Sequence, residues 1–223
     1  MPWAAWLKLD NPNQIQPDAA LAGRLWHALR DQHEAGKAAV RWLPTVTASE
    51  FSGICASAWD ADFERHPHWH GEPAETGPLA RWRTQPLVAA VLAEHGRGVS
   101  ARLLARLMDL AQCAGYIAAP DQWFASSWID AFSPLPGVGI ARVETARGTL
   151  WHRLRLEGEA EQELINEYSV VAPTEWNFHP CGAFVAALSG IAQVDEAELR
   201  QTARRLILAL DPCVPCQLEI RHA

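Results

Sequence analysis

The hydrophobic pattern of this chain changes its period near residue 134. Before that point apolar residues recur mainly at helical spacing, as in Leu103, Leu104, Leu107 and Leu110. After Pro134 and Pro136, the segments 138–145, 149–156 and 163–171 alternate or carry β-branched residues, which is typical of strands. We therefore predict an α+β fold, in which a helical N-terminal half packs with a small antiparallel sheet and C-terminal helices.

The same patterns predict the individual elements. Residues 1–16 are rich in Pro and Asn and predict an extended lead-in, and the Pro- and Gly-rich residues 64–78 predict a loop. Residues 38–43 predict a short strand or a buried extended segment. Helices are predicted at 17–36, 52–60, 85–95, 99–114, 183–190 and 196–209. Ser100 is the expected N-cap of the 99–114 helix, and Asp211-Pro212 should end the last helix because Pro cannot continue it.

Length and charge limit the class of protein. A chain of 223 residues can form one domain with a substantial core, and we predict a single domain over 1–223, helical over about 1–133 and mixed over about 134–223. The net charge of -7 argues against nucleic-acid binding. No apolar run approaches the ~20 residues that span a bilayer, and the first residues do not resemble a secretory signal, so we expect a cytoplasmic protein without a membrane partner. Most of the eleven Trp residues should lie in the core, with a few on a partner surface.

Two cysteines near the C-terminus form the sharpest chemical signal. Cys213 and Cys216 are three residues apart in Asp211-Pro212-Cys213-Val214-Pro215-Cys216. The intervening turn brings both thiols to one side, where they can bind a soft or borderline metal such as iron, nickel or zinc. The pair follows a helix instead of preceding one, which argues against a thioredoxin-like redox site. Two unpaired thiols remain the simplest alternative.

A closed zinc site is a second alternative for this pair. It needs about four ligands, and the candidates for the other two are Cys55, Cys113, Cys181, His179 and the histidines of the 64–78 loop. His66, His68 and His70 alternate in that loop and could also bind metal. The pattern favours instead a solvated loop whose histidines pair with nearby carboxylates such as Glu64 or Glu72, because a loop rich in Pro and Gly holds ligands poorly.

Arg147 closes one predicted strand, just before Gly148. It could be an ordinary surface arginine in a turn. It could also point into a pocket that holds small anionic or polar groups, because guanidinium stays charged and offers five donors. The residue alone leaves both interpretations open.

Four stretches together resemble the large subunit of NiFe hydrogenases. The segment 77–81 (GPLAR) is similar to that family's G-P-L-A-R, 143–152 (VETARGTLWH) to its E-A-P-R-G-x-L-x-H, 173–177 (PTEWN) to its P-T-x-W-N and 211–216 (DPCVPC) to its D-P-C-x-x-C. They occur in the family's order. The second Cys pair of the catalytic subunits, R-x-C-G-x-C, has no counterpart, since no C-x-x-C precedes residue 213. The combination resembles the accessory proteins HupK and HoxV, which look like shortened large subunits.

This resemblance implies a maturation scaffold and not an enzyme. Cys213 and Cys216 would bind an Fe(CN)2(CO) unit, Arg147 would donate to its cyanide, and Pro173 and Thr174 would contact the same diatomic ligands. No nickel is expected. The implied partners are the large subunit of an uptake NiFe hydrogenase and maturation proteins, including a small HypC-type chaperone. The alternatives are a metal-free chaperone of the large subunit, a minimal hydrogenase that recruits ligands such as His68, His70 or Cys181, and a zinc-stabilised domain of other function.

Overall fold

The computed structural model describes residues 3–16, 20–30, 40–55, 59–124, 127–158, 164–191 and 195–221. The helices of this part are α1 (Trp3–Trp6), η1, a 3-10 helix (Pro12–Gln14), α2 (Ala20–Leu29), α3 (Ala48–Cys55), α4 (Ala61–Arg65), α5 (Pro78–Trp82), α6 (Pro86–His95), α7 (Val99–Ala118), α8 (Pro120–Phe124), α9 (Pro173–Asn177), α10 (Ala183–Ser189) and α11 (Glu196–Leu210). The strands are β1 (Arg41–Trp42), β2 (Ala74–Glu75), β3 (Ile129–Leu135), β4 (Val138–Thr145), β5 (Gly148–Glu157) and β6 (Leu164–Val171). Among the described residues, none of the helices combines the length and the apolar composition that a membrane span requires.

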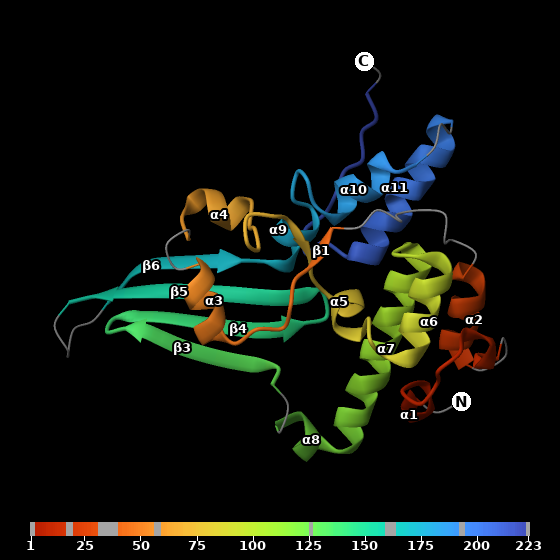
Figure 1. Cartoon of the computed structure of the whole chain (residues 1–223), viewed down its shortest axis with the longest axis horizontal. Helices are drawn as coiled ribbons and strands as arrows, with labels where there is room; N and C mark the ends of the chain where they lie inside the picture. The colour runs from red at the N-terminus through yellow and green to blue at the C-terminus, as the bar shows by residue number, and fades with distance from the viewer. Residues whose placement is uncertain are drawn as a thin grey trace.

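The strands form two sheets. The larger sheet is an antiparallel meander in the order β3-β4-β5-β6, and the smaller pairs β1 with β2 in parallel. Figure 1 shows the helices α3, α4 and α9 on one side of the meander and the helices around α7 beyond its end. The predicted α+β fold and the antiparallel sheet are confirmed, as are the helices 85–95, 99–114, 183–190 and 196–209.

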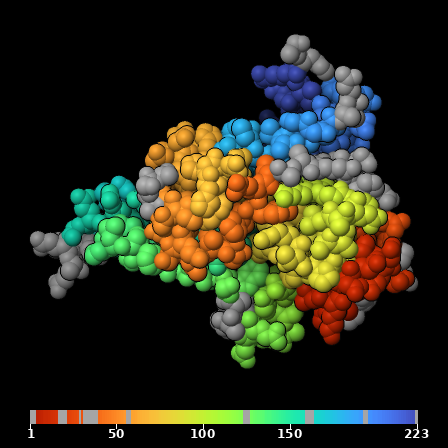
Figure 2. All heavy atoms as spheres, in the orientation of Figure 1, coloured from red at the N-terminus to blue at the C-terminus, as the bar shows by residue number. Residues whose placement is uncertain are grey.

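Three hydrophobic clusters form the core, and the smallest packs α10 and α11 on the start of α7. The first surrounds α7 and is formed by α1, α2, α5 and α6, with Leu104 and Met108 fully buried at its centre. The second lies between the meander and the helices α3, α4 and α9, where the ring of Phe51 stacks on that of Trp151 with centroids 3.7 Å apart. Many of the tryptophans are buried, as expected, and those that the structure describes as buried are Trp6, Trp26, Trp59, Trp69, Trp151 and Trp176. In the space-filling view the segment that carries α3 and α4, in orange, lies between the strands, in green to teal, and the helices α5 and α6, in yellow (Figure 2).

Several local predictions were wrong. Residues 1–16 contain α1 and η1 where an extended lead-in was predicted, because Trp6 and Ile15 are buried against the first cluster. The helix predicted at 52–60 is α3, which begins at Ala48. Its start is fixed by a capping box, in which Thr47 Oγ1 accepts from the Glu50 N–H and the Glu50 carboxylate accepts from the Thr47 N–H. Residues 56–58 lie outside the described residues.

Other boundaries also moved. The helix α7 begins at Val99 after Gly98, so Ser100 is not the N-cap but is buried inside the first turn. The predicted loop 64–78 contains β2, where Ala74 and Glu75 are both buried. Of the short strand or buried extended segment predicted at 38–43, Arg41 and Trp42 form β1, and residues 38 and 39 lie outside the described residues. Of the helix predicted at 17–36, the structure shows Ala20–Leu29 as α2, and residues 17–19 and 31–36 lie outside the described residues.

Candidate functional site

The end of α11 delivers the two cysteines to the surface. The helix ends at Leu210, and its C-cap Asp211 adopts the left-handed conformation, with φ 52°. Asp tolerates this conformation better than most residues, and Pro212 then prevents the helix from continuing. Cys213 and Cys216 follow in an exposed segment without helix or strand. The predicted end of the helix at Asp211-Pro212 is therefore confirmed.

Asp211 fixes this segment through two arginines. Its Oδ2 lies 3.1 Å from an Nη of Arg106, on α7, and 3.4 Å from Nε of Arg147, in the β4–β5 turn. Arg106 also donates to the carbonyl of Leu208 at 2.8 Å, so it holds the last turn of α11. These contacts join α7, the β4–β5 turn and the end of α11. They place the cysteine segment beside Arg147, which the sequence predicted as a site residue.

Thr174 contacts Cys213 directly. The Cys213 N–H donates to Thr174 Oγ1 at 3.1 Å, and the Thr174 hydroxyl lies 3.3 Å from Cys213 Sγ, to which it can donate. Thr174 is the second residue of α9, whose first residue, Pro173, is buried and fills the N1 position, where a missing N–H is not needed. Cys216 Sγ lies 3.6 Å from the Val214 carbonyl. The sequence therefore predicted residues that the fold brings together from three separate segments.

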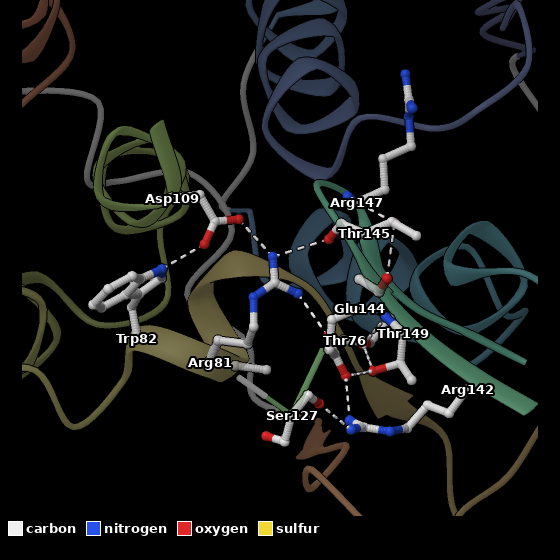
Figure 3. A network of polar contacts seen from close by, with 12 residues as sticks. Thr76, Arg81, Trp82, Asp109, Ser127, Arg142, Glu144, Thr145, Arg147 and Thr149 are labelled. Carbon is white, nitrogen blue, oxygen red and sulfur yellow. Dashed lines mark hydrogen bonds and ion pairs between the residues drawn. The ribbon is translucent and has the colours of Figure 1, made fainter. Parts of the chain in front are cut away.

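Arg147 extends outward from a buried polar network. In Figure 3 its side chain points away from Arg81, Glu144 and Thr149, and the side chain is 44% exposed. Its N–H donates to Thr145 Oγ1, which in turn donates to the Gly148 carbonyl, so the turn is closed by its own residues. The guanidinium therefore lies on a braced turn and faces outward.

The interior beside Arg147 is filled. A cavity of about 10 Å³ lies there, lined by residues that include Thr76, Asn177 and Leu210. This volume is about what one water molecule requires. A group larger than water on Cys213 and Cys216 would therefore lie on the solvent side of Arg147 and not behind it.

The remaining cysteines do not join this pair. Within the ranges that the structure describes, no three His, Cys, Asp or Glu side chains lie close enough to hold a metal ion. Burial raises the pKa of Cys55 to about 12, and burial and the nearby Asp109 raise that of Cys113, so both thiols resist forming the thiolate that binds metal. Cys181 is exposed, and its N–H donates to Nδ1 of His179.

One loop histidine pairs with a nearby carboxylate, as predicted. His66 Nδ1 lies 3.1 Å from a carboxylate oxygen of Asp62, which is its partner in place of the two named examples, and Glu72 pairs with Arg41. The rings of His66 and His179 lie edge to face with centroids 5.8 Å apart. His70 packs on Trp69.

We predict a pH dependence of stability from His179. Its burial, and then the neighbouring His66 and His68, lower its pKa, although Asp62 opposes them. The unfolded chain therefore binds a proton at His179 more readily than the folded protein. This contribution to stability is present above pH about 6.5 and should be lost as the pH falls below that value, through the lower pKa of the folded state. Comparing melting temperatures at pH 7.5 and 5.5, we expect a smaller decrease for His179→Gln than for the parent chain.

The half-buried Glu175 also affects how the stability of the protein depends on pH. Burial raises the pKa of its carboxyl, so its contribution to stability changes with pH in the direction opposite to that of His179. The difference between parent and variant isolates His179. His70→Gln is the matched control, since its ring packs on Trp69 outside the His66–His179 contact. Equal pH profiles for His179→Gln and the parent would contradict the prediction.

The fold and the cysteine segment define a chain built like the core of a hydrogenase large subunit. The family model for nickel-dependent hydrogenases matches residues 45–219, and the chain belongs to this family. Over 91% of its length it also resembles the solved structure of a variant of the NiFeSe hydrogenase from Desulfovibrio vulgaris Hildenborough, with a TM-score of 0.58 and 17% identity, covering 57% of that chain. At this identity the likeness shows the fold alone.

Within this family the chain is similar to accessory proteins. It is 35% identical over 184 residues to the hydrogenase expression/formation protein HoxV of Cupriavidus necator, covering 81% of this chain and 47% of HoxV. It is also 35% identical over 202 residues to the hydrogenase expression/formation protein HupK of Rhizobium leguminosarum bv. viciae, covering 87% of this chain and 51% of HupK. The chain thus spans about half the length of these curated relatives. The resemblance predicted from the four sequence stretches is confirmed.

Proposed function

We propose that this chain is a hydrogenase maturation scaffold that carries an Fe(CN)2(CO) unit on Cys213 and Cys216. It would pass this unit to the large subunit of an uptake NiFe hydrogenase and would not itself turn over hydrogen. The observation that carries the proposal is the meeting of Cys213 with Thr174, and of Asp211 with Arg147, at one exposed place. The similarity to HoxV and HupK, which are hydrogenase expression/formation proteins, supports a role in maturation.

The chemistry of the residues suits such a cargo. Two thiolates are soft ligands for low-spin iron, and three diatomic ligands would fill most of its other positions. The Thr174 hydroxyl can donate to the Cys213 sulfur and accepts from the Cys213 N–H, so it holds this ligand in place. Arg147 keeps its charge and could donate to a cyanide nitrogen while Asp211 holds its Nε.

Exposure of the pair favours transfer over permanent binding. Both thiols lie at the surface, and the cavity of about 10 Å³ beside Arg147 is too small to hold the cargo. An incoming thiolate of an acceptor could therefore displace Cys213 or Cys216 from the iron by ligand exchange, with no change of oxidation state. A small HypC-type chaperone would be the donor, and the hydrogenase large subunit the acceptor. The sequence holds no second C-x-x-C, so we propose no nickel site and no hydrogenase activity.

A metal-free chaperone of the large subunit is the second candidate. The observation that favours it is a groove of about 630 Å³ beside α7, with the exposed Leu110 and Ile117 in its lining. Exposed apolar surface of this kind often marks a protein-binding region. Arg106 and Ala146 also line the groove, so it lies next to the cysteine segment. The two candidates share a partner and differ in the cargo.

Infrared spectroscopy separates the two candidates. We expect protein purified after co-expression with the hydrogenase maturation proteins to show cyanide and carbonyl stretches, and the Cys213→Ser, Cys216→Ser variant to show none. The Cys113→Ser, Cys181→Ser variant removes two other exposed thiols and should keep the bands. A parent that lacks the bands but still captures the large subunit would leave the metal-free chaperone as the better account.

A further inference from the structure

Arg147 and Thr174, called here the two arms of the cysteine site, come from segments that are separate in the sequence. Arg147 lies in the β4–β5 turn, and Thr174 lies on α9. Residues 75–77, at the end of the small parallel sheet, contact the segments that carry both arms. We propose that Thr76 is a positioning residue that holds both arms, Arg147 and Thr174, in place. Only the purpose of this positioning, the binding of a cargo, rests on the proposed function.

The backbone of Thr76 holds the α9 arm. Its N–H donates to the side-chain carbonyl of Asn177 at 3.0 Å, and both residues are buried. Asn177 is the last residue of α9, one helical turn after Thr174. The orientation of α9, and with it the hydroxyl that contacts Cys213, is therefore tied to residue 76.

The hydroxyl of Thr76 holds the Arg147 arm. Thr76 Oγ1 accepts from the Thr149 N–H at 3.0 Å and donates to Thr149 Oγ1 at 3.2 Å. Thr149 in turn donates from its hydroxyl to Glu144 at 2.7 Å, so the protons of this chain have one consistent direction. Thr149 lies two residues after Arg147 at the start of β5, and Glu144 lies three residues before it on β4. The Thr76 hydroxyl thus joins both strands that carry the turn (Figure 3).

Two glycines bring these backbones into direct contact. A Cβ on Gly148 would lie 2.6 Å from Thr76 Cγ2 and 2.9 Å from the Gly77 nitrogen, and a Cβ on Gly77 would lie 2.8 Å from the Arg147 carbonyl oxygen. Both have φ in the region that favours glycine, +116° at Gly77 and +137° at Gly148. The chain at residues 76 and 77 therefore lies against the Arg147 turn, and neither glycine leaves room for a larger residue.

Arg81 and its carboxylate partners also support this turn. Arg81 donates to Glu144 at 2.8 Å and to the Thr145 carbonyl at 3.0 Å, and it also pairs with Asp109 on α7. These contacts of Arg81 hold the turn to the helical layer. The position of the turn relative to α9 then depends on Thr76. Loss of the Thr76 hydroxyl should therefore loosen the turn locally without unfolding the protein.

The test compares Thr76→Val, which keeps the shape and removes the hydroxyl, with Thr76→Ser, which keeps the hydroxyl. Thr202→Val is the matched control, since Thr202 is buried in α11 and outside this network. Trypsin cleavage of the Arg147–Gly148 bond in the native protein reports opening of the turn. Thr76→Val removes both hydrogen bonds of the hydroxyl, which should raise this cleavage at least about fivefold. We expect no change in Thr76→Ser or in Thr202→Val.

The infrared spectrum of the loaded protein gives the second measurement. A displaced Arg147 changes the donor to cyanide, so the cyanide bands of Thr76→Val should shift while those of Thr76→Ser match the parent. Unchanged cleavage and bands in Thr76→Val would overturn the proposal, as would faster cleavage that is equal at Arg204 and Arg205, which means general destabilisation. A parent without cyanide bands would refute the iron cargo, and the cleavage rates would then decide the positioning role by themselves.

Discussion

Replacing Arg102 with Met will lower the free energy of unfolding by about 3–5 kcal/mol, the usual result of leaving one charge of a buried pair without its partner. Arg102 on α7 donates from Nε and Nη2 to the two carboxylate oxygens of Glu75, at 2.7 and 2.9 Å. Both side chains are 2% exposed. Urea unfolding followed by circular dichroism measures the change.

The cost should come from Glu75 and not from lost packing, because Met fills much of the volume of Arg. The double variant Arg102→Met, Glu75→Met should therefore recover a large part of the lost stability, since it removes both charges. Arg155→Met is the matched control. Arg155 pairs with Glu167 across β5 and β6 at 3.6 Å, with both side chains about half exposed, and its loss should cost less than about 1 kcal/mol. Equal losses in Arg102→Met and Arg155→Met would refute this account.

The buried Arg102–Glu75 pair also helps to position the cysteine site relative to α7. Glu75 directly precedes Thr76, so the ion pair with Arg102 fixes to α7 the same segment that holds the two arms of the cysteine site. Arg106, one turn further along α7, holds Asp211 and the end of α11. The helix α7 is thus the common reference for the cysteine segment and for the turn that carries Arg147.

The sequence predicted the members of the candidate site better than it predicted their supports. Cys213, Thr174 and Arg147 lie in short stretches that resemble known motifs, and the fold brings them together. Glu75 and Thr76 lie in a segment rich in Pro and Gly, whose composition is typical of a loop. Their burial depends on the packing of α7, which no local pattern reveals. The role of Arg106 was missed for the same reason.

The strand β3 shows a second limit. The sequence of Ile129–Leu135 contains Pro134, which argues against a strand because Pro cannot donate to a neighbouring strand. In the structure β3 is an edge strand, and its register shifts between Phe132 and Leu135, where the pairing with β4 tolerates Pro. The start of α3, in contrast, could have been predicted, because the sequence contains the capping-box pattern Thr47-x-x-Glu50.

Replacing Trp151 with Ala will destabilise the protein by about 3–5 kcal/mol, as expected for removing a large aromatic side chain from a packed core. Trp151 lies on β5 and is fully buried, and its ring stacks on that of Phe51 from α3. It therefore joins α3 to the middle of the meander. Thermal and urea unfolding followed by circular dichroism measure the loss without relying on tryptophan fluorescence.

Trp151→Phe separates packing from hydrogen bonding in this prediction. The Trp151 Nε1–H is buried without an acceptor among the described residues, and an unsatisfied buried donor costs about 1–3 kcal/mol. Phe removes that donor together with some apolar area, so the two effects should largely offset each other, and Trp151→Phe should cost far less than Trp151→Ala. Phe132→Ala, at an exposed position on β3, is the control and should change stability little. A loss in Trp151→Phe as large as that in Trp151→Ala would show that the indole N–H stabilises the fold after all.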